Sequence, residues 1–336
     1  MFVVGHSHST EYLMSSISGH IGALPRPRPM QHALAPFAMR FTAMGGPNEV
    51  AIFAADREAA GRALHAAAHE VLRIEAKYSR YRNDSVVSRI NAGAGELGAV
   101  ECDAETLALL ECADQLHSLS DGLFDVTSGV LRRAWNFASG HLPKPEDLEP
   151  LLPLVGWERV ERTAEGVRLP TVGMQIDLGG IGKEYAADQA ARVLQAAGIA
   201  HGFVNLGGDI RVIGPQPDGE AWPIGVQNPR ARGEIIARVP VARGGLATSG
   251  DSEKFIEVDG IRYFHILNPR TGYPVVHWAS VSVRAETALA AGALSTIAML
   301  KERDAVAFLT LQNCSFLAID TKGKLHSNAP ATPETC

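Results

Sequence analysis

A glycine-rich turn carries the clearest chemical signal in this chain. The segment Gly179-Gly180-Ile181-Gly182-Lys183 joins an expected strand, Met174–Leu178, to the start of an expected helix. Free N–H groups and the dipole at a helix N-terminus favour anions such as a pyrophosphate. Glycines let the backbone approach such a ligand closely, and Lys183 adds a positive charge. The spacing does not fit a Walker A loop, and a tight strand-to-helix turn without a ligand explains the turn equally well.

Two further segments offer polar groups for binding or proton transfer. Asp125 and Thr127 follow Phe124 in a polar loop, where a carboxylate beside a ring could bond a nucleobase or flavin edge. An Asx-turn around a buried Phe is an equally good interpretation. His265 stands at the end of an expected strand, before a Pro-Arg-Thr-Gly turn, and is a candidate acid or base. A single His is more often a structural residue, so its position alone does not decide between the two roles.

A second glycine pattern misleads. Residues 93–98 read Gly-Ala-Gly-Glu-Leu-Gly and fit the GxGxxG fingerprint of dinucleotide-binding domains. That fingerprint requires a preceding strand and a following helix. Here the pattern follows the end of an expected helix and no helix start comes after it, so a Rossmann site is not expected.

Periodicity and turn signals predict the elements that position these groups. Apolar residues recur at helical spacing in residues 56–78, 103–119, 183–197 and 286–300. Strands are expected in residues 38–54 around a turn at Met44, in 203–213 and in 280–284. Hairpins are expected in 316–325 and in 255–267, the latter with Asp259-Gly260 in a two-residue turn that favours positive φ. The Pro- and acid-rich segment 143–153 is the strongest internal boundary signal. Without regular β-α-β alternation, we expect an α+β fold of mostly antiparallel sheets packed with helices.

Composition excludes several classes of protein. The chain has 336 residues with a net charge of -6, so it presents no basic field for nucleic acid. It contains no run of about 20 apolar residues that could span a membrane. Its 4 cysteines form no CxxC pair, which argues against a metal site built on thiolates. Residues 1–36 have no signal-peptide pattern and are predicted to be a disordered leader, with residues 331–336 a short tail; a cytoplasmic location follows as the expectation.

The motifs occur together in an order that resembles the FAD:protein FMN transferase family, the ApbE-like flavin transferases. The resemblance covers roughly residues 38–325 and rests on blocks that are individually weak. These blocks are Met44-Gly45, the segment from Glu75 to Tyr81 with Ser85 and Asn91, Gly122–Thr127, Asp177–Lys183, Asn205–Asp209, Thr248–Asp251 and His265–Gly272.

The resemblance implies an activity and a set of site residues. Family members bind FAD and Mg²⁺ between two lobes and transfer FMN through a phosphoester to a Thr of a target flavoprotein. The residues implied to bind FAD are Met44, Ser79, Arg80, Tyr81, Asp125, Thr127, Gly179, Gly180, Lys183, Glu184, Asn205, Gly208, Asp209, Ser249, His265 and Ile266. His265 and Thr248 would lie near the reacting phosphate, with His265 as the base that deprotonates the acceptor. A homodimer is possible in such a fold.

The chain departs from the family pattern at the metal. The family's last helix usually carries Asp-Ala-Leu-Ala-Thr, whose Asp and Thr share one helical face and hold Mg²⁺. Here Gly292 stands at the Asp position and only Thr296 is kept, alongside a backbone carbonyl near Gly182. Glu184 replaces a usual Gly, and Glu184 or Glu286 could supply another carboxylate.

The missing carboxylate leaves the activity open between three possibilities. The chain could be a transferase with an altered or retained metal site. It could instead be an FAD-binding protein with weak or no transfer, serving as a flavin carrier or regulator. A third possibility is an FAD pyrophosphatase that releases FMN and AMP.

Overall fold

The computed structural model describes residues 33–231, 233–252 and 255–328, and the backbone of 332–333. Residues 1–32 of the predicted leader and 334–336 of the predicted tail lie outside the described residues. The first strand begins at Ala35, close to the predicted start of the folded region. Thr332–Pro333, which the sequence placed in the tail, form a short strand, β16, because they pair with another strand.

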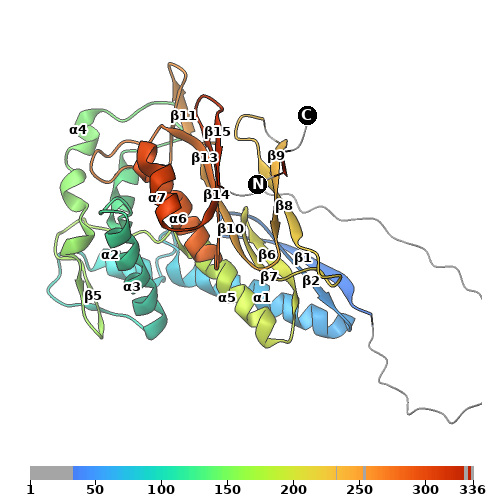
Figure 1. Ribbon diagram of the computed structural model, residues 1–336. Coiled ribbons are helices and arrows are strands. Elements are labelled where there is room, and N and C mark those ends of the chain that lie inside the picture. The colour runs from blue at the N-terminus through green and yellow to red at the C-terminus, as the bar shows by residue number, and fades with distance from the viewer. Residues whose placement is uncertain (1–32, 232, 253–254, 329–331, 334–336) are drawn as a thin grey trace, which may run out of the picture.

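An eight-stranded antiparallel sheet forms the centre of the fold (Figure 1). The strand order is β1-β2-β6-β7-β10-β13-β14-β15. The strands are β1 (Ala35–Ala43), β2 (Gly46–Ala54), β6 (His201–Leu206), β7 (Asp209–Gly214), β10 (Gly244–Gly250), β13 (Trp278–Ala285), β14 (Ser315–Asp320) and β15 (Leu325–Ser327). The α+β prediction with mostly antiparallel sheets is therefore confirmed.

Three smaller sheets complete the strands. The β11–β12 hairpin (Phe255–Val258 and Ile261–Phe264) turns at Asp259-Gly260, which both have positive φ as predicted. A second sheet has the order β16-β9-β8, with β8 at Trp222–Gln227 and β9 at Ile235–Val241. A third joins β3 (Val100–Glu101), β5 (Gly166–Arg168) and β4 (Glu161–Arg162).

The helices begin at residues that suit a helix start. Asp56, Asp103 and Thr287 each accept a backbone N–H in the first turn of α1, α3 and α6. The helices are α1 (Arg57–Tyr78), α2 (Val86–Ala92), α3 (Ala104–Leu119), α4 (Pro145–Leu148), α5 (Gly182–Ala196), α6 (Ala288–Lys301) and α7 (Ala305–Leu311). Short 3-10 helices occupy Val126–Arg133, Leu152–Leu154, Trp157–Arg159 and Glu302–Asp304. None of the helices in the described part of the chain is long and apolar enough to cross a membrane.

The central sheet is covered on both faces. Helices α1, α5 and α6 cover one face, and the β8–β9 hairpin lies against the other (Figure 1). Strand alternation divides the core accordingly, because Val204 packs on the helix side and its neighbour Phe203 packs with Trp222 on the other. A third apolar cluster joins Val130, Leu148 and Leu267, and so connects α4 to the segment after β12.

Three sequence predictions were wrong in detail. Met174–Leu178 is extended but pairs with no strand among the described residues, because the Asn91 side chain bonds both the N–H and the C=O of Ile176. Residues 203–213 form two strands rather than one, since Gly207 and Gly208 take positive φ and turn the chain back. Segment 143–153 is not a free boundary, because it forms α4 and buries Leu148.

An ion-pair network between α1 and α3 predicts how stability depends on pH. Hydrogen bonds from Arg73, then from Lys77 and Tyr185, lower the pKa of Glu105 from 4.5 to about 2. The folded pKa is below the unfolded one, so this contribution is complete above about pH 5 and disappears as the pH falls toward 2. Because the network is partly exposed, we expect Glu105→Gln to lower the free energy of unfolding by only about 1 kcal/mol at pH 7. Urea unfolding of both proteins should show this difference shrinking from pH 5 to pH 2; a difference that is constant with pH would contradict the network's role.

Candidate functional site

Asp177 connects three of the sequence blocks. Its Oδ2 lies 3.0 Å from Nη1 of Arg80, which comes just after α1. Its Oδ1 accepts the N–H of Gly179 at 2.9 Å, and its own N–H donates to the carbonyl of Val126 at 2.8 Å. Because the Asp177 side chain is largely buried, these bonds fix the strand-like segment that leads into the glycine turn. The sequence contained Asp177 in a motif but did not predict this role.

The glycine turn then enters α5 in the predicted manner. A Cβ on Gly180 would lie 3.2 Å from Cζ of Phe124, so a glycine lets the aromatic ring approach the backbone. A Cβ on Gly182 would meet no described atom within 4 Å, so there is room beside the helix start. Among the described residues no side chain caps the N-terminus of α5. These features suit an anion at the first turn of a helix.

Lys183 lies beside the β6–β7 turn. Its Nζ is 2.5 Å from Oδ2 of Asp209, and Asp209 is only 4% exposed. The side chain of Asn205 accepts the N–H of Gly208 at 2.9 Å and holds the turn in place. The structure therefore brings together the predicted residues Lys183, Asn205, Gly208 and Asp209.

Glu184 points from α5 to the position of Gly292 in α6. A Cβ on Gly292 would lie 2.5 Å from Cγ, 2.8 Å from Cδ and 2.6 Å from Oε1 of Glu184. Glu184 is 7% exposed, and its Oε2 has no hydrogen-bond partner among the described residues. Burial, followed by the nearby charge of Asp209, raises the pKa of Glu184 above its ordinary value. The Glu184 side chain thus fills the space that a side chain at position 292 would need.

Asp188, one helical turn beyond Glu184, fixes α5 against α6. Its two carboxylate oxygens accept the N–H groups of Ala288 and Leu289 at 3.0 Å each. It also pairs with Arg211 of β7, at 3.2 Å from Nε. Asp188 was not among the site residues predicted from the sequence. An acid four positions after Glu184, on the same face of an Ala-rich helix, was the available signal.

Hydroxyl groups line the neighbouring part of α6 and β10. Ser249 Oγ lies 3.0 Å from Oγ1 of Thr296 and 2.8 Å from Oγ of Ser295. Thr248 Oγ1 lies 2.6 Å from Oγ of Ser282 on the adjacent strand β13. The predicted residues Ser249 and Thr296 are therefore in contact. The Thr248 side chain is not part of this group, because successive strand residues alternate and Thr248 faces the β8–β9 side of the sheet with Leu246 and Ser282.

The residues predicted to bind FAD away from its pyrophosphate lie in two turns. Met44 and Gly45 both have positive φ in the β1–β2 turn, and the Met44 N–H donates to Oε1 of Glu75 at 2.6 Å. Ser79 ends α1, its Oγ accepts the Tyr81 N–H at 3.2 Å, and the Tyr81 ring is 79% exposed. The guanidinium of Arg80 lies 5.0 Å from the centre of that ring.

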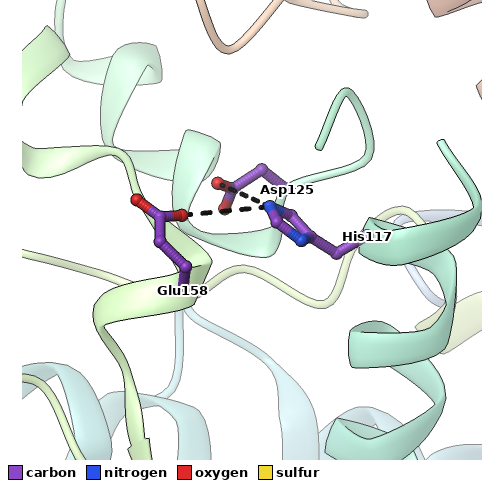
Figure 2. Close-up of side chains that lie close together, drawn as sticks. All are labelled: His117, Asp125 and Glu158. Carbon is purple, nitrogen blue, oxygen red and sulfur yellow. Dashed lines mark ion pairs between the residues drawn. The ribbon is translucent and has the colours of Figure 1, made fainter. Parts of the chain in front are cut away.

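Asp125 and Thr127 form hydrogen bonds with each other and with the backbone of Gly156 and Trp157. Asp125 accepts the N–H and the hydroxyl of Thr127 through Oδ1, and the N–H of Trp157 through Oδ2 at 3.0 Å. Figure 2 shows His117 and Glu158 beside this carboxylate. Nε2 of His117 lies 3.9 Å from Oδ2 of Asp125 and 4.0 Å from Oε2 of Glu158. Both oxygens of Asp125 therefore already have partners within the protein.

His265 and Ile266 directly follow β12, as the sequence predicted. Ile266 is 8% exposed, and its carbonyl accepts the N–H of Val275 at 3.2 Å. The following turn is anchored by Trp135, whose Nε1 donates to the carbonyl of Gly272 at 2.8 Å. These contacts give His265 a fixed backbone position, and its catalytic role stays a prediction.

The fold is that of flavin transferases of known structure. The chain aligns with a crystal structure of the ApbE protein from Thermotoga maritima at a TM-score of 0.80 and 32% identity, covering 87% of this chain and 97% of that one. It aligns with the flavin transferase ApbE from Vibrio cholerae at a TM-score of 0.78 and 26% identity, covering 88% and 98% of the two chains.

Sequence comparison gives the same class. Residues 44–317 match the ApbE family, and the chain belongs to that family. An FAD:protein FMN transferase of Haemophilus influenzae is 32% identical over 236 residues, which are 66% of this chain and 68% of the relative. One of Treponema pallidum is 33% identical over 256 residues, or 69% and 70% of the two chains.

The contact between Glu184 and Gly292 predicts a reversal of a common substitution effect. Replacing an interior helical Gly by Ala normally stabilises a protein by about 1 kcal/mol. Here the new methyl group would overlap Glu184, so Gly292→Ala should destabilise by about 1–3 kcal/mol. In a Glu184→Ala background the same change should instead stabilise by about 1 kcal/mol. Denaturant unfolding of the four proteins measures both effects.

Gly61 of α1 is the matched control, because a Cβ there would meet no described atom within 4 Å. Gly61→Ala should stabilise both backgrounds equally. If Gly292→Ala had the same sign with and without Glu184, the two residues would not share that space.

Proposed function

We propose that this chain transfers FMN from FAD to a Thr of a target flavoprotein, assisted by a divalent metal ion. One observation carries the proposal: contacts within the structure bring four separate sequence blocks to the first turn of α5. Arg80 reaches Asp177, Phe124 packs against Gly180, and Lys183 pairs with Asp209. The family membership and the transferase relatives support the same activity.

The first turn of α5 supplies the groups that a pyrophosphate requires. Backbone N–H groups at the helix start and the ammonium of Lys183 provide positive charge beside the open space at Gly182. Phosphoryl-type transfer depends mainly on positioning and charge neutralisation, so these groups are suited to it. The exposed Tyr81 ring with Arg80 offers a flat surface for a ring of the same substrate.

The residues present fit a divalent cation. A buried carboxylate oxygen without a hydrogen-bond partner among the described residues lies beside α6, close to the acid Asp209. Such an oxygen is the donor that a hard cation prefers. The hydroxyl of Thr296 and the carbonyl of Gly182 are the further ligands expected from the sequence. When bound, Mg²⁺ would neutralise charge on the pyrophosphate and on the departing AMP.

The transfer itself requires one proton to move. The acceptor Thr oxygen would bond to the phosphorus on the FMN side, and the bond from that phosphorus to the bridging oxygen would break as AMP leaves. The acceptor hydroxyl proton would pass to His265, whose imidazole can accept it near neutral pH.

A transfer assay tests this function. The chain is incubated with FAD, Mg²⁺ and an acceptor flavoprotein that the Haemophilus influenzae relative modifies; flavin fluorescence of the denatured acceptor and AMP release are measured together. We expect equal amounts of AMP and covalent flavin. AMP with free FMN and no labelled acceptor would indicate a pyrophosphatase, and tight FAD binding without AMP would indicate a carrier.

His265→Asn should lower the transfer rate about 100-fold or more while FAD affinity changes little, because a general base acts on the rate. His141→Asn, at an exposed loop position, is the matched control and should be unchanged. An unchanged rate for His265→Asn would remove His265 as the base.

A further inference from the structure

The metal-ligand pattern of α6 is incomplete in this chain. Gly292 and Thr296 lie one helical turn apart and share a face, as an Asp and Thr would in a paired site. Gly292 offers no side chain, so α6 alone supplies one neutral hydroxyl. Mg²⁺ beside phosphate groups is usually held in proteins by one or two carboxylates together with the phosphates. The question is therefore which acidic side chain reaches this face of α6.

The neighbouring helix provides such a group. Cγ, Cδ and Oε1 of Glu184 all lie within 2.8 Å of the place where a Cβ of residue 292 would be. The Glu184 carboxylate thus occupies the volume of an Asp side chain at position 292, although it comes from α5. Thr296 lies one turn further along the same face of α6, next to Ser249. The carboxylate and hydroxyl are arranged as if both came from α6.

The state of the carboxylate also indicates a missing partner. Glu184 is 7% exposed, and Oε2 has no hydrogen bond among the described residues. A buried polar atom without a partner costs free energy, and such atoms occur where a ligand or ion completes the site. The neighbouring Lys183 is shared with Asp209, so two buried acids adjoin one ammonium group. A cation would balance this charge.

Other acids do not reach this position. Glu286, the alternative in the sequence, is exposed before α6 begins. Asp188 is occupied by the N-terminus of α6 and by Arg211. Asp188 nevertheless contributes, because it locks the two helices in the register that brings Glu184 to Gly292.

We propose that Glu184 is the carboxylate ligand of the metal site, and that Gly292 is small because the Glu184 side chain must pass through its space. The acid has in effect been exchanged between two helices, α6 giving up a side chain and α5 gaining one. This inference rests on the proposed function only in the identity of the cation and of the anion beside it.

Mn²⁺ binding to the full chain tests the exchange without relying on transfer. The EPR signal of free Mn²⁺ is titrated with protein, alone and with FAD present and no acceptor. We expect Glu184→Gln to weaken Mn²⁺ binding at least about tenfold, and Glu286→Gln to leave it unchanged. FAD affinity without metal, followed by flavin fluorescence, reports separately on the proposed substrate site.

The exchanged variant is the decisive comparison. Glu184→Gly combined with Gly292→Asp places the carboxylate back on α6. This double variant should bind Mn²⁺ within about threefold of the parent affinity, which is well short of the loss of about tenfold or more expected when the carboxylate is removed. Gly292→Asp alone, which crowds two acids together, should not improve binding. Thermal unfolding checks that each variant folds; if the double variant does not, Glu184→Asp should bind Mn²⁺ more tightly than Glu184→Gln. Parent-like affinity in Glu184→Gln would overturn the proposal.

Discussion

The close packing of α5 against α6 is the contact on which the site depends. Asp188 closes the N-terminus of α6 with two hydrogen bonds and pairs with Arg211 of the sheet. This one buried carboxylate sets the relative position of two helices and a strand. Glu184 can then lie against Gly292, and the N-terminus of α5 is presented beside the β6–β7 turn with its Lys183–Asp209 pair. Small residues along both helices permit the approach, since Ala187, Ala191, Ala288 and Ala291 are buried.

A second set of contacts fixes Met174–Leu178, the segment that leads into the glycine turn before α5. Arg80 and Gly179 bond Asp177 from two directions, and Asn91 bonds the backbone of Ile176. An irregular segment is thereby fixed without a strand partner, and the N–H and C=O of Ile176 and the N–H of Asp177 are hydrogen-bonded. Because no strand in the described part of the chain pairs with it, the segment can turn sharply into α5. The site is rigid on both sides of the helix start, which suits a reaction that depends on positioning.

Local signals in the sequence predicted most of the regular elements. Apolar spacing located α1, α3 and α6, and the Asp259-Gly260 turn located a hairpin. Strands β8 and β9 were missed because Pro223 and Pro240 interrupt their pattern; the two prolines lie opposite each other in this sheet. The segment before α5 was taken as a strand because its side chains are apolar, although what holds it is the amide of a distant Asn.

At the site, too, sequence motifs predicted individual residues but not their contacts in the folded chain. Motif order identified the family and named Lys183, Asp209 and Thr296, but the pairing of Lys183 with Asp209 depends on tertiary packing. The sequence showed the loss at position 292 and offered Glu184 or Glu286 as a replacement carboxylate. The structure distinguishes the two, because Glu184 lies against Gly292 and Glu286 is exposed before α6. Asp188 contacts residues about a hundred positions away, so no local pattern could have assigned its role.

A crystal structure of the chain with FAD and Mn²⁺ would show which residues bind the metal, because anomalous scattering locates Mn²⁺. We expect the metal to be bonded to the Glu184 carboxylate and the Thr296 hydroxyl, with the pyrophosphate at the first turn of α5 beside Lys183. A pyrophosphate bound elsewhere, or a metal at that position without Glu184 among its ligands, would contradict this expectation.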